Sequence, residues 1–219
     1  MKKFSSLVLV FSILFSLNGF CQTAQNDPKA LEVLNKASAA YNKAGGVKAG
    51  FIIKILAKGG TVKDNLSGSI MLKGSKFKLD TGDMTTWFDG INQWVYIQTN
   101  NEVNLSKPSA KELLMINPVN VFQLYNHGFT SKLLADKAEN GKKFYQVELK
   151  PNAKTDITLS IVASFDKSTY RPISITITNK DKSGSKISIG SYLTGQAYTD
   201  AQFAFQPKEY PNTEVVDLR

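Results

Sequence analysis

The chain has 219 residues, of which 42% are hydrophobic and 21% are charged. This length suits one domain with a sizeable core, and the composition excludes a disordered or low-complexity protein. The formal net charge is +9, but the lysines are scattered and only two arginines occur, so nucleic-acid binding is not indicated. The charge fits equally well a weak attraction to anionic membrane surfaces or ordinary solubility.

The first residues predict an export signal. Lys2 and Lys3 precede an apolar stretch, residues 7–17, that is too short to span a bilayer comfortably. We therefore expect residues 1–21 to be a cleaved signal peptide and residues 22–219 to form one exported domain.

The single cysteine leaves two interpretations of this segment open. Cleavage between Cys21 and Gln22 gives a mature chain without cysteine, and hence without disulfides. Alternatively, Cys21 carries a lipid anchor, although Phe20 stands where a lipidation signal normally has a small residue.

A helix is expected at the start of the mature chain. Asp27 is a good N-cap, Pro28 suits the first helical position, and Gly45-Gly46 ends the helix. One apolar stripe recurs at spacings of three and four: Leu31, Leu34, Ala37, Tyr41 and Ala44. This stripe predicts a helix that lies against a sheet.

After the helix the apolar period changes to two, which predicts strands. In the first long strand one face carries apolar residues and the other carries lysines; the apolar face holds Val47, Ala49, Phe51, Ile53, Ile55 and Ala57. Residues 68–103 continue as a run of short strands that contains both tryptophans. Asp89-Gly90 lies between them and predicts a hairpin turn, because such turns need positive φ.

Two short apolar helices are expected to interrupt the strands. Ser109 and Glu112 form a capping-box pattern, and Asn117-Pro118 starts a second helical stretch that ends at Gly128. Apolar helices between strands suggest a lid.

Alternating strands then resume at 133–135, with a hairpin turn at Asn140-Gly141 and a last short strand at Phe203 and Phe205. The pattern predicts a mainly β protein with about ten or eleven antiparallel strands, and a sheet of that size must curl. Either the sheet closes and fills its own interior, or it forms an incomplete barrel around a hydrophobic cavity.

Catalysis finds no support in the sequence. The only histidine, His127, follows the lid helices and has no cysteine partner in the mature chain. No His, Cys, Asp or Glu residues show metal-ligand spacing, and no glycine-rich phosphate loop occurs. We expect neither an enzyme nor a cofactor.

The order of these motifs resembles that of the periplasmic outer-membrane lipoprotein carrier family, the LolA-like proteins, and more loosely the outer-membrane receptor LolB. The similar features follow the N-terminal helix and its long strand: 68–73 leading into Phe77, Asp89-Gly90 before 94–96, the lid at Asn117-Pro118, and the ending 203–207 with 214–217. One departure is the stretch Lys73-Gly74-Ser75, because family members carry an arginine there that is associated with lid closure.

The resemblance implies an incomplete antiparallel β-barrel with an N-terminal helix and a two-helix lid over a hydrophobic cavity. Such a protein is a monomeric carrier that takes acylated lipoproteins from an inner-membrane lipoprotein-releasing ABC transporter and delivers them to an outer-membrane acceptor, LolB-like or unknown. The alternative is an anchored receptor or a lipid sensor of the same fold. Ten residues are expected in the cavity, although the sequence does not decide which strand face points inward: Met71, Phe77, Trp87, Trp94, Tyr96, Leu113, Leu114, Ile116, Phe122 and Tyr125.

Overall fold

The computed structural model describes residues 25–109, 112–113, 118–139, 142–153 and 158–219. Its helical elements are the α-helix α1 (Pro28–Lys43) and the 3₁₀ segments η1 (Pro118–Asn126), η2 (Asp200–Phe203) and η3 (Pro207–Glu209). None of the helices within these ranges is both long and apolar enough to cross a membrane.

The strands form one sheet of 13 strands. They are β1 (Gly46–Leu56), β2 (Val62–Lys73), β3 (Lys76–Asp80), β4 (Met84–Phe88), β5 (Gln93–Ile97), β6 (Glu102–Ser106), β7 (Phe129–Leu133), β8 (Lys137–Glu139), β9 (Lys142–Pro151), β10 (Thr158–Asp166), β11 (Pro172–Asn179), β12 (Gly184–Leu193) and β13 (Glu214–Asp217).

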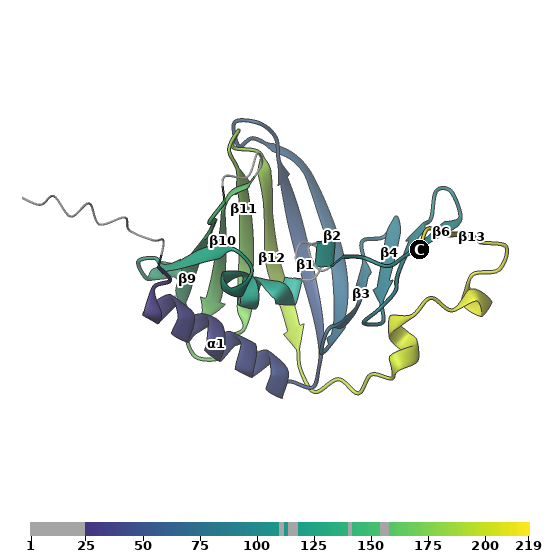
Figure 1. The fold of residues 1–219 in the computed structure, drawn as a ribbon, viewed down its shortest axis with the longest axis horizontal. Coiled ribbons are helices and arrows are strands. Elements are labelled where there is room, and N and C mark those ends of the chain that lie inside the picture. The colour runs from purple at the N-terminus through teal and green to yellow at the C-terminus, as the bar shows by residue number, and fades with distance from the viewer. Residues whose placement is uncertain (1–24, 110–111, 114–117, 140–141, 154–157) are drawn as a thin grey trace, which may run out of the picture.

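The sheet is large, curved and open (Figure 1). Its order is β13-β6-β5-β4-β3-β2-β1-β12-β11-β10-β9-β7, with β8 paired to β9. All neighbours are antiparallel except β13 and β6, which run parallel. Because β7 and β13 end the order without pairing to each other, the predicted incomplete antiparallel barrel is confirmed. The sheet has more strands than expected because β8 and β13 are only three and four residues long.

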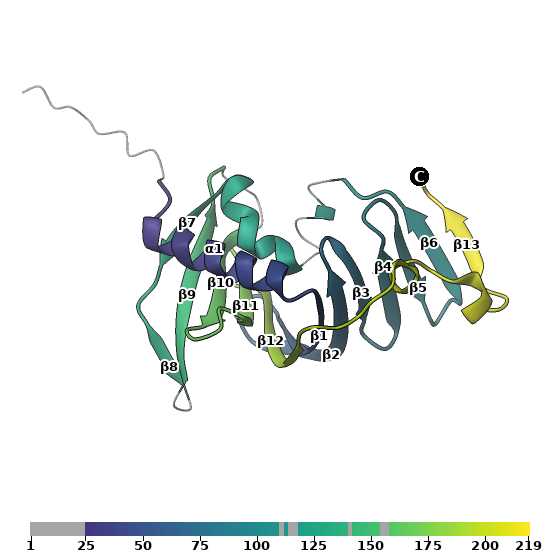
Figure 2. The ribbon, with the colours of Figure 1, turned by 90° about the horizontal axis from the view of Figure 1, so that it is seen from below.

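Different segments cover the two faces of the sheet. Helix α1 and the segment η1 lie over the concave face formed by β1 and β9–β12 (Figure 2). The chain after β12 runs along the other face of β3–β5 and then adds β13 beside β6 (Figure 2). We call residues 194–217 the C-terminal strap.

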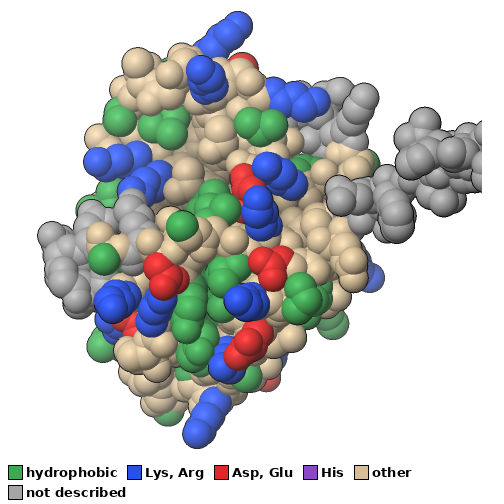
Figure 3. Space-filling model, turned by 90° about the vertical axis from the view of Figure 1, so that its left-hand side faces the viewer, with side chains coloured by type: hydrophobic (Ala, Val, Ile, Leu, Met, Phe, Trp, Pro, Cys, Tyr) green, Lys and Arg blue, Asp and Glu red, His purple; other side chains and the backbone are tan. Residues whose placement is uncertain are grey.

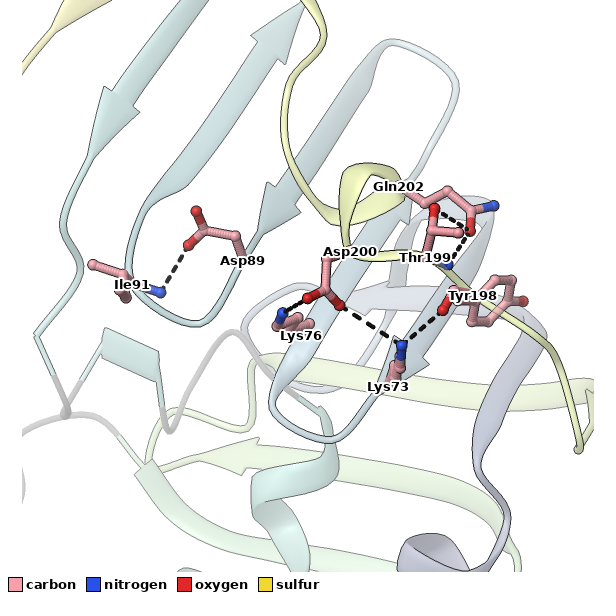
Figure 4. A network of polar contacts seen from close by, with 8 residues as sticks. All are labelled: Lys73, Lys76, Asp89, Ile91, Tyr198, Thr199, Asp200 and Gln202. Carbon is pink, nitrogen blue, oxygen red and sulfur yellow. Dashed lines mark hydrogen bonds and ion pairs between the residues drawn. The ribbon is translucent and has the colours of Figure 1, made fainter.

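The β4–β5 hairpin turns where the sequence predicts it. Gly90 has a φ of 104°, which a residue with a side chain rarely adopts. The Asp89 carboxylate accepts a hydrogen bond from the backbone N–H of Ile91 at 2.8 Å (Figure 4). It accepts a second from the backbone N–H of Asn92 at 2.7 Å. The acidic side chain therefore supplies the local bonds that hold this turn.

Three sequence-based expectations need correction. The stretch with Phe203 and Phe205 is not a strand: the Gln202 side chain accepts a hydrogen bond from the Thr199 N–H at 2.8 Å, and this local bond favours the 3₁₀ turn η2. The second lid helix is a 3₁₀ segment instead of an α-helix. The strand expected at 133–135 instead runs from Phe129 to Leu133, and residues 134–135 are not part of it. The expected turn at 140–141 lies outside the described residues.

Candidate lipid-binding site

The concave face of the sheet is apolar because the period-two pattern of its strands is in register. In β1, Val47, Ala49 and Phe51 are buried, whereas Lys48 and Lys54 are exposed on the opposite face. Partner residues in neighbouring strands share a face, and the residues opposite the buried β1 positions are also apolar. These pairs are Val47 with Leu72, Ala49 with Ile70, and Phe51 with Ile189. The predicted assignment of the apolar face of β1 is confirmed.

Helix α1 is fixed at both ends of its path across this face. Near its N-terminus, the Asp27 carboxylate accepts hydrogen bonds from the backbone N–H groups of Lys29 and Leu133, at 2.9 and 3.0 Å. The bond from Leu133 is the main reason that the pKa of Asp27 is lowered. At the other end, the Tyr41 hydroxyl donates to the backbone carbonyl of Gly74 at 2.7 Å. Burial raises the pKa of this phenol, which stays protonated and can donate.

One helix cannot cover strands of this length. An α-helix is about 10 Å wide and a strand rises about 3.3 Å per residue, so α1 shields about three residues of each strand that it crosses. Strands β1, β2 and β12 are 11, 12 and 10 residues long. Their apolar pattern therefore extends beyond the helix toward the far end of the strands.

The lid segment η1 covers part of this extension. Phe122 is buried between Tyr41 of α1 and Phe165 of β10, with ring centroids at 6.3 and 5.8 Å. The Tyr125 hydroxyl donates to the Asn35 side-chain oxygen at 2.9 Å. Among the described residues, this hydrogen bond is one of few polar contacts between η1 and α1, and most of the contact is apolar.

The first lid helix starts as predicted. The Glu112 carboxylate accepts hydrogen bonds from the backbone N–H and the hydroxyl of Ser109, both at 2.7 Å. These bonds lower the pKa of Glu112. Leu113, the next residue, packs partly buried against the main core. The predicted capping box is confirmed, and residues 114–117 lie outside the described part of the chain.

Beyond α1, six apolar side chains of the concave face keep part of their surface exposed. We call this set the open concave face: Ile53, Ile55, Leu66, Ile177, Ile187 and Ile189. Ile53 lies directly opposite both Ile187 and Leu66, and Ile187 lies opposite Ile175, so this surface is continuous across four strands. Leu66 is 38% exposed. Polar residues begin only at its tip end, where Ile55 lies opposite Asp64 and Ser185. A continuous apolar surface suits an acyl chain, which needs contact area and no directional partner.

The ten predicted cavity residues do not come together in one place. Four belong to or pack against the main core, which lies between the concave face, α1 and the lid: Phe77, Leu113, Phe122 and Tyr125. Three lie in a second cluster on the opposite face of the sheet: Trp87, Trp94 and Tyr96. Met71 pairs with Lys78, and Lys78 pairs with Trp87, so Met71 belongs to this opposite face as well. Leu114 and Ile116 lie outside the described residues. One enclosure cannot hold all these side chains, because the sheet separates the two groups.

The second cluster is covered by the C-terminal strap. Trp87 contacts the rings of Phe205 and Tyr210 edge-on, with centroids at 5.7 and 5.6 Å. Tyr210 also contacts Tyr96, at 4.8 Å. The side chains of Trp87 and Tyr96 therefore pack against Phe205 and Tyr210 of the strap, which follow much later in the sequence.

Ion pairs hold the strap at the turn between β2 and β3 (Figure 4). Asp200 lies 2.8 Å from the Lys76 ammonium group and 3.7 Å from that of Lys73. The Lys73 ammonium group also donates to the backbone carbonyl of Tyr198 at 2.7 Å. The hydrogen bond from Lys76 lowers the pKa of Asp200. At the site where the carrier family has its lid-associated arginine, the described basic groups therefore bind the strap.

Other features of the described residues give no chemical site. No group of three or more His, Cys, Asp or Glu side chains there is arranged to hold a metal ion. His127 is exposed at the end of η1. A pocket of about 400 Å³ at the edge made by β7 and β9 has Asp27, Lys132 and Glu148 in its lining, which is unsuited to an acyl chain.

Together, the open curved sheet, the apolar concave face and the helical cover define a half-barrel of the kind that holds an apolar ligand. The model of the family described as "Outer membrane lipoprotein carrier protein LolA" matches residues 17–182. The chain therefore belongs to this LolA family. The match ends before β12 and the strap, so the resemblance noted for 203–217 is not part of it.

One solved structure shares the fold at low sequence identity, and a second is less similar. An uncharacterized conserved protein from Thermus thermophilus is 12% identical and has a TM-score of 0.59. The match covers 86% of this chain and 99% of the other chain. A LolA superfamily protein from Nitrosomonas europaea is 13% identical, covers 80% of this chain and 97% of its own, and has a TM-score of 0.46. No curated protein matches the sequence significantly.

The sequence prediction omitted the open concave face. Its signal was present, because apolar residues alternate with lysines along β1, and the 16-residue helix can cover only a fraction of that pattern. The prediction instead favoured large aromatic and Met side chains, which here are mostly core residues of one face or the other.

Proposed function

We propose that this protein is a periplasmic carrier that binds the acyl chains of lipoproteins and moves them from the inner to the outer membrane. The observation that supports this best is the open concave face, an apolar surface that α1 leaves partly exposed in a member of the LolA family. Export by a signal peptide at residues 1–21 is part of the proposal.

Binding on this surface rests on burial of acyl methylene groups. Each buried CH₂ contributes about 0.8 kcal/mol, so a long chain that displaces the Phe122 side chain gains enough to offset the contacts that it replaces. Phe122 packs next to Phe165, and we assign it the role of a plug that leaves when cargo enters. Phe77, Leu113 and Tyr125 then line the opened site, with Leu114 and Ile116 as further expected contacts.

The carrier role implies two partners, one that supplies the lipoprotein and one that receives it. A lipoprotein-releasing ABC transporter of the inner membrane supplies the acylated protein, and an outer-membrane acceptor removes it. Neither step makes or breaks a covalent bond. The alternative, an anchored receptor or lipid sensor of the same fold, applies if Cys21 carries a diacylglyceryl group, and the mass of the mature N-terminus separates the two.

Native mass spectrometry of the protein purified from its own periplasm tests the proposal. We expect a bound species whose added mass equals that of an acylated lipoprotein or its lipid-bearing fragment. A ligand-free protein that also fails to bind a synthetic triacylated peptide would contradict the carrier role.

A further inference from the structure

Two hairpins meet at the ends of strands β1, β2, β11 and β12 that lie opposite α1. The turn between β1 and β2 and the turn between β11 and β12 stand together at the top of Figure 1. The Gly59 N–H donates to the backbone carbonyl of Asp181 at 3.1 Å and links the two turns. We call residues 54–66 and 179–187 the hairpin tip.

The hairpin tip is strongly basic. It contains six lysines, all exposed, and two carboxylates; the lysines are Lys54, Lys58, Lys63, Lys180, Lys182 and Lys186. None of these lysines forms an ion pair with a described residue, in contrast to Lys36, Lys73 and Lys76 elsewhere in the chain. One of the two acids, Asp181, is already bonded to the N–H and hydroxyl of Ser183, at 3.0 and 2.6 Å.

Two of these lysines are placed against each other. Lys54 of β1 lies directly opposite Lys186 of β12 in the sheet register. Like charges at opposed positions destabilise a sheet, so this arrangement does not serve folding. A negatively charged partner at the tip would remove that repulsion.

Apolar side chains stand among the lysines. Val62 is 55% exposed and directly precedes Lys63, and Leu66 is 38% exposed four residues further. On neighbouring stretches of β1 and β10, Ile52 and Leu159 are 51% and 48% exposed. Figure 3 shows the same combination, with lysine or arginine side chains at the upper end of the molecule and hydrophobic ones just below them.

We propose that the hairpin tip docks on the surface of a bilayer that contains anionic phospholipids. Lysine ammonium groups bind phosphate headgroups, and Val62 enters the interface between headgroups and acyl chains. Long flexible lysines suit mobile headgroups, and the planar arginine fork that favours fixed carboxylate pairs is absent from the tip. A lipid surface explains the exposed apolar residues as well as the charge, whereas an acidic protein surface explains only the charge.

This docking goes beyond the carrier role and does not depend on it, because the tip lysines and Val62 are not part of the site proposed for cargo, although Ile55, Leu66 and Ile187 belong to both surfaces. It has a geometric consequence, however. The open concave face lies on β1, β2, β11 and β12, the same strands that end at the tip, so docking brings the tip end of this face close to the bilayer.

Vesicle flotation tests the proposal with the full mature protein and no lipoprotein present. The vesicles consist of phosphatidylcholine alone or of phosphatidylcholine mixed with phosphatidylglycerol. The tip variant replaces Lys58, Lys63 and Lys182 by Gln. The control variant makes the same change in charge elsewhere, at Lys132, Lys143 and Lys208, which are also exposed and form no ion pair with a described residue.

We expect the wild type and the control to float with the anionic vesicles at low salt and the tip variant to bind about 100-fold more weakly, at about fivefold per lysine. A second variant, Val62→Trp, should show a blue shift of tryptophan emission with the anionic vesicles only. Equal binding by the tip and control variants, or no binding of the wild type to anionic vesicles, would overturn the proposal while leaving acyl-chain binding untouched.

Discussion

Ile53 and Ile187 provide the sharpest test of the open concave face. The two residues lie opposite each other in β1 and β12, and both keep part of their surface exposed on the concave side. We consider the double variant Ile53→Asn/Ile187→Asn. An acyl chain that lies on this surface must then cover two amide groups that it cannot hydrogen-bond.

The size of the effect follows from the cost of desolvation. Covering a polar amide without a partner costs about 1–3 kcal/mol. Two such groups, together with the lost apolar contact, weaken acyl-chain binding by about 3 kcal/mol, or about 100-fold. The substitutions also cost folding free energy, so the variant must first be shown to be folded by its melting curve at the assay temperature.

The chain offers a matched control on the other face. Ile52 and Leu193 are 51% and 55% exposed, and both lie on the face of the sheet that carries Lys48. The assay is fluorescence anisotropy of a fluorescent acyl probe, with displacement by a triacylated peptide. The double variant Ile52→Asn/Leu193→Asn should bind like the wild type. If the outer-face variant lost as much affinity as the inner-face variant, or if neither lost any, the assignment of the concave face as the binding surface would be refuted.

Three further outcomes follow from the structure. Phe122→Ala removes the plug between α1 and β10, so the free energy of unfolding in denaturant should fall by about 3–5 kcal/mol while affinity for the acyl probe rises; a loss of affinity in a folded variant would count against the plug. The Asp166 carboxyl has a pKa of about 2, mainly because the Ser168 hydroxyl donates to it, so its stabilisation is complete above pH 4 and is lost as the pH falls through 2. Chemical denaturation across this range should show that Asp166→Asn lacks this loss, and parallel acid profiles would exclude it. Phe205→Ala uncovers one side of Trp87, so tryptophan emission should shift to the red at unchanged secondary structure, and an unchanged spectrum would mean that the strap does not shield the ring.

The sequence predicts the concave face of the sheet well where only one side is covered by the chain. In β1 the buried Val47, Ala49 and Phe51 alternate with Lys48, Gly50 and Ile52, which are more exposed, so period two identifies the inner face. The same holds in part for α1: its cap at Asp27 appears as expected, and the predicted Leu34, Ala37 and Tyr41 are buried. Ala30 and Val33 are buried as well, whereas the predicted Leu31 is only partly buried.

In β4 the alternation carries no such information, because both faces are covered. Thr85, Thr86, Trp87 and Phe88 are all buried, so neighbouring residues that point to opposite faces look alike in the sequence. The cover on the outer face comes from Phe205 and Tyr210, far along the chain, and no local pattern announces that contact.

The C-terminal strap departs from its local pattern for a related reason. Phe203 and Phe205 alternate with small or polar residues, as in a strand, yet both are buried against aromatic rings contributed by the strap and by β4. The 3₁₀ turn at Asp200–Phe203 and the ion pairs of Asp200 direct them there. Tertiary contacts therefore outweigh the local propensity in this segment.

Site-specific photocrosslinking in the periplasm tests the central claim most directly. A photoreactive amino acid is placed at Ile187 on the open concave face or at Ile52 on the outer face, in cells that make a lipoprotein or its non-acylated cysteine variant. We expect a crosslink from position 187 to the acylated protein only, and none from position 52. Crosslinks that form equally from both positions, or that persist without acylation, would show that this face does not hold acyl chains.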